Sequence, residues 1–316
     1  MSDRRFVSGG VTAVSMSLLA AATWAGWPAA ARAARTPAGA ASFTVTGVLN
    51  GVAASSARNA WAVGEIGAGK TLTVHWNGKA WRRVRSPSPA GYNGVMAVAV
   101  TSARNAWAVG STGSGKLLIL HWNGMSWKQS PAPVAAGGTL SAVSATSATS
   151  AWAAGHTNSG KALILRWNGT RWQPARLPAA AVAGSLSAVA AVSASSAWAV
   201  GSTSTGPTLI LRWNGVIWKR VPSPNPDGHA ALYGVAATSS TAWAVGQAAG
   251  NYTLILRWNG TTWKRVSSPP ARPLGGDYLF AVDATSARSA WAVGGVGTCC
   301  ANPQTLIARW NGARWK

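Results

Sequence analysis

Residues 242–263 read AWAVGQAAGNYTLILRWNGTTW, and this stretch decides the fold. It opens with a short apolar run that Gly246 ends. Residues 253–258 follow, mostly apolar, with the β-branched and aromatic side chains that are typical of a strand. Asn259-Gly260 comes next and is the strongest short signal for a β-hairpin. The stretch therefore predicts a strand, a turn, a second strand and a hairpin.

Two further segments complete this unit. Residues 232–237 form an apolar run ahead of it, and residues 262–266 return from the hairpin before a pair of prolines ends the unit. No helical period occurs within it. The unit is therefore expected to be four short antiparallel strands joined by tight turns.

Two tryptophan segments recur six times along the chain. The segment Ala-Trp-Ala-(Val/Ala)-Gly places its tryptophan at Trp61, Trp107, Trp152, Trp198, Trp243 and Trp291. The segment Trp-Asn-Gly-x-x-Trp places its pair at Trp76 and Trp81, Trp122 and Trp127, Trp167 and Trp172, Trp213 and Trp218, Trp258 and Trp263, and Trp310 and Trp315. The spacing is 45 or 46 residues until the last repeat, where it lengthens. Four antiparallel strands in a unit of this size are typical of a β-propeller blade.

Both faces of the third strand are apolar, which indicates how the units are arranged. Leu209, Leu211 and Trp213 point to one side, and Ile210 points to the other. Because such a sheet needs cover on both faces, we predict an all-β fold, a six-bladed β-propeller of four-stranded antiparallel blades. The paired tryptophans are expected between blades and the first-segment tryptophans in the core, with sugar stacking by the latter as the alternative. The repeats are expected at about residues 48–93, 94–138, 139–184, 185–230, 231–277 and 278–316.

The first 33 residues have the features of an export signal. Arg4 and Arg5 precede an apolar run at residues 11–22, and Ala-Arg-Ala at 31–33 matches a cleavage site. The run is short for a membrane span, and no other stretch could form one. We therefore expect a secreted protein, extracellular or associated with the cell wall, exported by the Sec or the twin-arginine route. The expected divisions are a signal peptide at 1–33, a linker at 34–41 and the propeller at 42–316.

Closure of the ring is expected to involve the start of the mature chain. The sixth repeat lacks most of its outer strand, because the chain stops at Lys316 directly after Trp315. Residues 42–46 alternate like a strand and have no place in the first repeat. We expect them to pair with the end of the sixth blade, since an open ring would expose two sheet edges.

The charge indicates a class of partner. The chain has 28 Lys and Arg against 5 Asp and Glu, a net charge of +23. Such a surface attracts polyanions. For an exported protein, an anionic polymer or glycan of the cell envelope is the expected partner, with no specific nucleic acid. The expected state is a monomer.

Two groups of residues are candidates for binding. Lys70, Lys116 and Lys161 recur in the loops between the second and third strands, which in propellers share a face with the links between blades. Cys299 and Cys300 lie in the loop that lengthens the sixth repeat, as a vicinal disulfide or as free thiols. We expect all five around one rim. A second basic cluster follows the last tryptophan of several repeats, where it protects a sheet edge or docks a polyanion.

Motifs for catalysis are weak in this chain. Residues 64–71 match the phosphate-loop pattern, yet a strand rather than a helix is expected after Lys70, which contradicts nucleotide binding. The carboxylates and histidines do not recur at one acid–base position. No catalytic residue, cofactor site or metal site is therefore predicted, and the chain is expected not to be an enzyme.

The repeat V-x-A-x-S-x-x-x-A-W-A-V-G … L-I-L-R-W-N-G-x-x-W-K-R-V resembles two families of propeller repeat over residues 48–316. One is the tectonin type. The other is the Asp-box type of photosystem II stability factor-like proteins, although the Asp of that box is absent from every repeat here. The tectonin resemblance implies glycan binding, because proteins of that type are often lectins.

Three functions follow as hypotheses. The first is a non-enzymatic extracellular binding or scaffold propeller whose basic surface engages an anionic cell-envelope polymer. The second is a lectin that binds neutral glycan between blades. The third is a polysaccharide hydrolase or lyase with a site at the centre of the ring.

Overall fold

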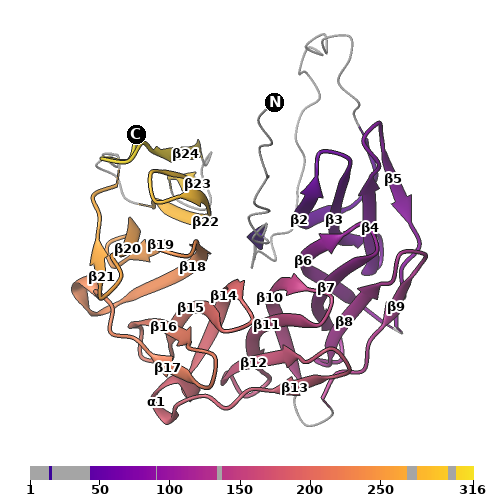
Figure 1. Ribbon diagram of the computed structural model, residues 1–316, viewed down its shortest axis with the longest axis horizontal. Helices are drawn as coiled ribbons and strands as arrows, with labels where there is room; N and C mark the ends of the chain where they lie inside the picture. The colour runs from indigo at the N-terminus through magenta and orange to yellow at the C-terminus, as the bar shows by residue number, and fades with distance from the viewer. Residues whose placement is uncertain (1–13, 16–42, 90, 134–136, 269–275, 298–303) are drawn as a thin grey trace, which may run out of the picture.

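The computed structural model describes residues 14–15, 43–89, 91–133, 137–268, 276–297 and 304–316. Antiparallel sheets follow one another along the chain around a common centre, each built from consecutive strands (Figure 1). Blade one has β2 (Val48–Ser56), β3 (Asn59–Ile66), β4 (Lys70–Trp76) and β5 (Trp81–Val84). Blade two has β6 (Asn93–Ser102), β7 (Asn105–Thr112), β8 (Leu117–Trp122) and β9 (Trp127–Gln129), and blade three has β10 (Gly138–Ser147), β11 (Ser150–Thr157), β12 (Ala162–Trp167) and β13 (Trp172–Pro174). Blade four has β14 (Gly184–Ser193), β15 (Ser196–Thr203), β16 (Thr208–Trp213) and β17 (Trp218–Arg220). Blade five has β18 (Ala230–Ala237), β19 (Ala242–Ala248), β20 (Tyr252–Trp258) and β21 (Trp263–Arg265).

Blade six has three strands, β22 (Tyr278–Ser286), β23 (Ser289–Val296) and β24 (Gln304–Trp310). In place of a fourth strand, Trp315 forms a single bridge to Trp310, and Lys316 exchanges two backbone hydrogen bonds of 2.8 and 2.9 Å with Arg309. The expected loss of most of this outer strand is confirmed. The architecture is the six-bladed β-propeller that the repeats predict.

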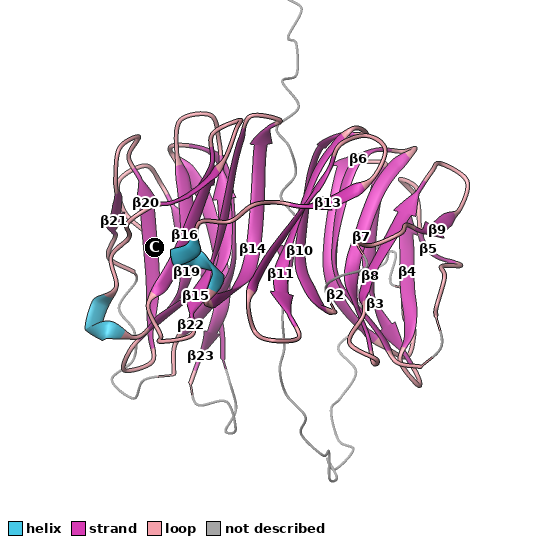
Figure 2. Ribbon diagram, turned by 90° about the horizontal axis from the view of Figure 1, so that it is seen from below, coloured by secondary structure: helices cyan, strands magenta, loops and turns pink. Residues whose placement is uncertain are grey.

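Little of the chain lies outside these strands. A single turn of helix, α1 (Ala179–Val182), and a 3-10 turn, η1 (Pro226–Gly228), lie in links between blades. Neither was expected from the repeat pattern. β1 (Val14–Ser15) pairs with β2 within the segment predicted to be a signal peptide. The first strand of each blade lies nearest the centre and the last lies outermost (Figures 1 and 2). No helix among the described residues is long and apolar enough to cross a membrane.

The Asn-Gly hairpins form as expected from their local chemistry. In blade five the side-chain oxygen of Asn259 accepts hydrogen bonds from the backbone N–H of Thr261, at 3.0 Å, and of Thr262, at 2.9 Å. Gly260 then adopts a φ of 104°, which a residue with a Cβ seldom adopts. These two residues set the register in which Trp258 pairs with Trp263.

The core lies between the blades rather than within them. Five hydrophobic clusters each combine side chains from two consecutive blades. Alternation along β16 explains this arrangement, because Leu209 and Leu211 join the cluster with blade three while Ile210 joins the cluster with blade five. The prediction that each sheet is covered on both faces by its neighbours is confirmed for blades two to five.

The tryptophans have the packing roles predicted for them at the five interfaces formed. Trp152 is covered by Trp213 of the next blade, with ring centroids 4.9 Å apart, and Trp218 meets it edge-on at 5.1 Å. The first-segment tryptophans of blades one to five are at most 3% exposed. Since they are buried, these five are not available as sugar-stacking platforms.

The ring is open between blade six and blade one (Figure 1). Over the described residues, no strand of blade six packs against blade one as the other neighbours pack. The prediction that residues 42–46 pair with blade six is wrong for residues 43–46, which form no strand. Instead, Phe43 and Val45 pack against buried Leu72 and Val74 of blade one. They cover apolar surface that no preceding blade covers, which is the physical reason for their position.

Candidate binding surfaces

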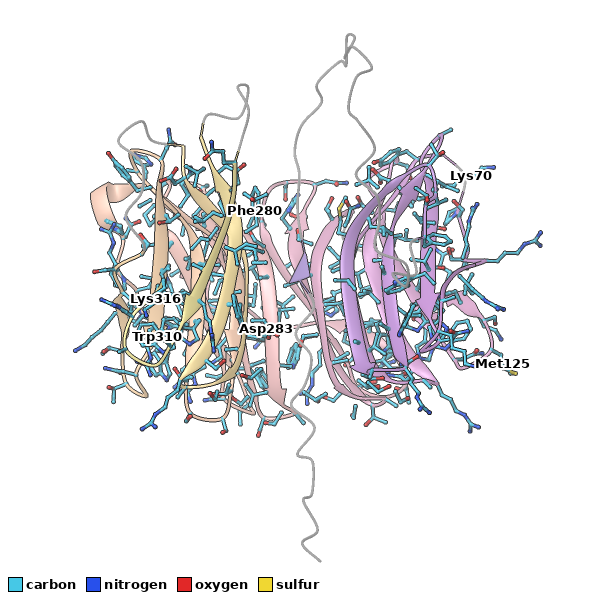
Figure 3. The ribbon with its side chains drawn as sticks, turned by 90° about the horizontal axis from the view of Figure 1, so that it is seen from above. Lys70, Met125, Phe280, Asp283, Trp310 and Lys316 are labelled. Carbon is cyan, nitrogen blue, oxygen red and sulfur yellow. The ribbon has the colours of Figure 1, made fainter. Side chains whose placement is uncertain are left out.

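Three candidate lysines lie on one face of the propeller. Lys70 begins β4, whereas Lys116 and Lys161 directly precede β8 and β12, and all three are exposed. Figure 3 places Lys70 near one face and Met125, on an Asn-Gly hairpin, near the other. We call these three residues the lysine rim.

The loops of the lysine rim are joined to neighbouring blades by hydrogen bonds. The backbone N–H of Asn93, at the start of blade two, donates to the Gly69 carbonyl at 2.6 Å. The Gly115 carbonyl accepts from the backbone of Gly138, at the start of blade three, at 2.7 Å, and from the Asn158 side chain at 3.2 Å. The expected sharing of a face between these loops and the links between blades is confirmed, and the loops rest on a fixed backbone.

Few carboxylates are available to neutralise the lysine rim. Repeats two and three, at 94–184, contain no Asp or Glu, so Lys116 and Lys161 have no acidic partner within their own repeats. Glu65 is the acidic residue of repeat one, and it accepts a hydrogen bond from the Tyr92 hydroxyl. Burial and this nearby carboxylate raise the pKa of Tyr92 to about 12. The rim therefore keeps a strong excess of positive charge.

A second set of cations surrounds the propeller on its outermost strands. Their side chains are exposed and lie on alternate faces of each outer strand. We call this set the outer belt: Arg82, Arg83, Lys128, Lys219, Arg220, Lys264 and Arg265. Because the chain has 28 basic and 5 acidic residues, most of its cations cannot be paired within the molecule.

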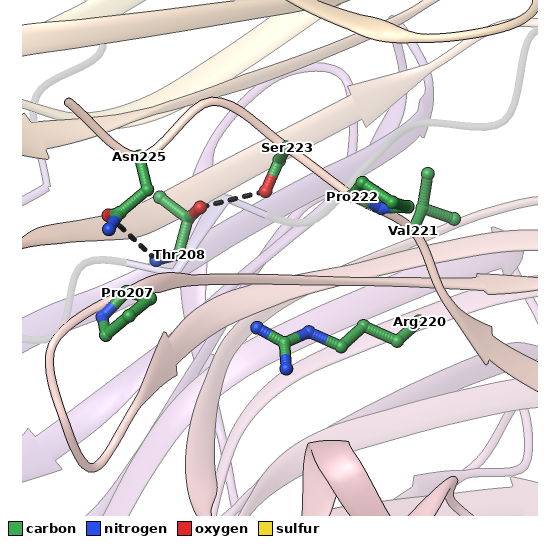
Figure 4. Close-up of a pocket in the computed structure, with 7 residues that line it drawn as sticks. All are labelled: Pro207, Thr208, Arg220, Val221, Pro222, Ser223 and Asn225. Atoms are coloured by element: carbon green, nitrogen blue, oxygen red, sulfur yellow. Dashed lines mark hydrogen bonds between the residues drawn. The ribbon is translucent and has the colours of Figure 1, made fainter. Parts of the chain in front are cut away.

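A groove of about 370 Å³ lies at the edge of blade four (Figure 4). Three of its polar side chains satisfy groups of the groove itself. The Thr208 hydroxyl lies 2.8 Å from that of Ser223, and the side-chain oxygen of Asn225 accepts from the Thr208 backbone N–H at 3.4 Å. Arg220 donates to the Ala180 carbonyl at 3.3 Å, which leaves most of its five N–H donors for another acceptor. The groove is therefore suited to an anionic group. Its lining is Pro207, Thr208, Arg220, Val221, Pro222, Ser223 and Asn225.

Sequence reasoning missed this groove, although part of its signal was present. Arg220 was assigned to an exposed edge strand. The link of residues 221–225, which forms the opposite wall, gave no pattern beyond its prolines. Whether a link folds back over its blade depends on contacts such as that between Thr208 and Ser223.

In blade one and in blade two, a histidine packs against the first-segment tryptophan of the same blade. The Trp107 and His121 rings are stacked 4.1 Å apart, and His75 lies 4.5 Å from Trp61. Each histidine donates through its Nε2–H to an asparagine side-chain oxygen 2.8 Å away. Burial lowers the pKa of both histidines. Their geometry is that of packed interface residues.

In the later blades, arginine replaces this histidine. The Arg166 guanidinium lies 5.2 Å from the ring centroids of both Trp152 and Trp213, one on each side of the interface. Such a sandwich combines cation–π attraction with burial of the arginine stem. Arg212 and Arg257 repeat it at the next two interfaces.

The remaining candidate motifs have different outcomes. Cys299 and Cys300 lie outside the described residues, so their place on the rim stays a prediction. The segment that matches a phosphate loop is followed by strand β4, as expected from its context. It therefore lacks the helix N-terminus that holds phosphates in a genuine phosphate loop.

No family model and no curated protein matches the chain. Similar solved structures exist. YCF48 bound to a D1 peptide is 18% identical, with a TM-score of 0.58, over 86% of this chain and 80% of its own. YCF48 from Cyanidioschyzon merolae is 17% identical, with a TM-score of 0.57, over 87% of this chain and 86% of its own. The BP39L lectin from Burkholderia pseudomallei is 16% identical, with a TM-score of 0.55, over 82% of this chain and 79% of its own.

The chain shares their propeller fold. This likeness confirms the predicted resemblance to tectonin-like and photosystem II stability factor-like propeller repeats. At these identities it shows the fold and does not assign an activity.

Proposed function

We propose that this protein is a non-enzymatic extracellular propeller that binds an anionic polymer or glycan of the cell envelope through the lysine rim. The observation that carries the proposal is the position of Lys70, Lys116 and Lys161. They are exposed on one face of three consecutive blades, and two of their repeats lack any carboxylate. A linear polymer with regularly spaced negative charges could contact successive blades.

The rigidity of the rim supports this proposal. Each rim loop is anchored by hydrogen bonds to a neighbouring blade or to a link between blades, so little loop ordering is required when a ligand binds. The net charge of +23 also speeds the encounter with a polyanion and makes binding sensitive to salt. The outer belt contributes to this long-range attraction.

The test compares two variants with equal charge. Lys70→Gln, Lys116→Gln and Lys161→Gln together lower the net charge from +23 to +20, as do Lys128→Gln, Lys219→Gln and Lys264→Gln on the outer belt. Binding to teichoic acid and to heparin is measured by titration at low and at high salt. Loss of three exposed charge contacts should weaken binding about tenfold in the rim variant. The outer-belt variant should bind nearly as tightly as the unmodified protein.

The result also separates this proposal from a neutral lectin. Polyanion binding should weaken steeply as salt rises, whereas stacking on a neutral sugar should hardly change. Equal losses in both variants would show that binding is diffuse and would contradict a specific rim. Competition by simple neutral sugars at high salt would favour the lectin.

The lectin stays the second candidate because propellers with sugar ligands share this fold. One similar structure is the SapL1 lectin in complex with alpha methyl fucoside, 14% identical, with a TM-score of 0.52, over 82% of this chain and 90% of its own. In this chain the edge groove at Arg220 is a place where a sugar could bind. A glycan array with Arg220→Gln as the matched variant would test it.

A further inference from the structure

Five interfaces between blades repeat one arrangement. The first-segment tryptophan of a blade lies beneath the Trp-Asn-Gly-x-x-Trp pair of the following blade. At three of these interfaces an arginine lies within 5.5 Å of a tryptophan on either side. Each interface therefore consists of two complementary halves, one from each blade.

Blade six presents the first half of this interface without the second. Trp291 is 48% exposed, whereas its five equivalents are at most 3% exposed. Arg309 lies 5.3 Å from the Trp291 ring centroid, and no second tryptophan among the described residues covers it. Blade six therefore supplies the tryptophan and the arginine of this stack, and the tryptophan pair of a following blade does not cover them among the described residues.

The apolar groups around Trp291 are uncovered as well. Ile307 is 64% exposed, although its equivalents Ile119, Ile164, Ile210 and Ile255 are fully buried. Val293, which pairs with Ile307 across the sheet, is also exposed. The face of blade six that borders the opening is therefore apolar, like the interfaces between the other blades, but it is exposed to solvent.

The two nearest candidates for covering this face are already engaged. In blade one, Phe43, Val45 and Trp81 pack against the same buried residues, which include Leu72 and Val74. The apolar surface of blade one that faces the opening is therefore covered in part by the chain's own start, and the same holds for any second copy. A second copy also carries the same charge of +23, which disfavours association.

We propose that the exposed face of blade six is a docking site for one further blade of this same repeat. The Trp-Asn-Gly-x-x-Trp pair of that blade would close over Trp291 and Arg309, as Trp258 and Trp263 close over Trp198 in this chain. The partner is thus a four-stranded sheet with this hairpin. The inference does not depend on the proposed polymer binding.

The experiment supplies such a blade and then releases it. A copy of residues 230–268, the described extent of blade five, is joined after Lys316 of the full chain by a Gly/Ser linker with a protease site. After folding, the linker is cut and the sample is passed over a sizing column. The matched control copy has both tryptophans of its Trp-Asn-Gly-x-x-Trp segment changed to alanine. The exposure of Trp291 is measured by acrylamide quenching of tryptophan fluorescence. The contribution of Trp291 is the difference in quenching between the protein and its Trp291→Phe variant.

The expected result is that the released copy stays with the chain and Trp291 quenching falls at least threefold, while the control copy separates. Separation of the unmodified copy would overturn the proposal. Trp291 already protected in the unmodified chain would also overturn it. Protection at all concentrations would mean that the ring closes on itself, and protection that grows with concentration would mean that a second copy occupies the face.

Discussion

Trp152 and Arg166 lie opposite each other on neighbouring strands of one blade, and this pairing recurs around the propeller. Blades one and two have histidine at the arginine position, beside Trp61 and Trp107. Both side chains place a flat group against indole. Only histidine changes its charge near neutral pH, because arginine stays protonated throughout the range in which proteins fold.

The histidines predict a loss of stability in mild acid. Burial lowers the pKa of His75 and His121 in the folded state, so the unfolded chain binds more protons below about pH 6.5. Their neutral form is fully compatible with folding above that pH, and stability should fall as the pH drops from there through the lowered pKa values. Urea unfolding between pH 8 and pH 4.5 measures the effect.

The control for this prediction uses the residue of the other blades. The double variant His75→Arg and His121→Arg should lose most of the pH dependence in that window, since arginine does not titrate there. An unaltered slope in the double variant would contradict the assignment.

At the scale of the elements, the Asn-Gly hairpin joins the two tryptophans that cover the preceding blade. Gly260 has a positive φ and open space where a Cβ would lie. Gly260→Ala should therefore lower the free energy of unfolding by about 1–2 kcal/mol, which is the cost of holding a residue with a Cβ at positive φ. Gly246→Ala places a Cβ against the Ala231 backbone oxygen and should cost more. Urea unfolding of both variants gives the comparison, and a larger loss in Gly260→Ala would be inconsistent with it.

Strands and hairpins were predictable because their signals are local. The turn chemistry of Asn259 and Gly260 and the alternation over residues 209–213 each act within a few residues, and the six copies repeat them. Burial of Trp152 and its equivalents followed from the need to cover both faces of a blade. The lysine rim was predictable because strand order alone places those loops on one face.

Other features depended on contacts that no local pattern encodes. Residues 43–46 alternate as a strand does, yet the apolar face of blade one attracts Phe43 and Val45 more directly than any sheet edge does. The fold-back of the link over Thr208, which shapes the groove of blade four, likewise depends on tertiary hydrogen bonds. The opening beside blade six could not be predicted from local patterns, because it depends on the angle between successive blades around the ring.

At the scale of the whole molecule, stability comes from interfaces between successive blades, as in other repeat proteins. Five interfaces are complete and the sixth is open, so blade six has one uncovered face, whereas Phe43 and Val45 cover part of the facing surface of blade one. The same open arc leaves the lysine rim intact, because the rim belongs to blades one to three. Binding at the rim and docking at blade six are therefore separable.

The central claim is that the repeated tryptophan stabilises the protein only where the next blade covers it. The direct measurement is urea unfolding of Trp152→Ala beside Trp291→Ala. Trp152→Ala removes a fully covered indole and should cost about 3–5 kcal/mol, whereas Trp291→Ala should cost less than about 1 kcal/mol. Equal losses in the two variants would contradict the account.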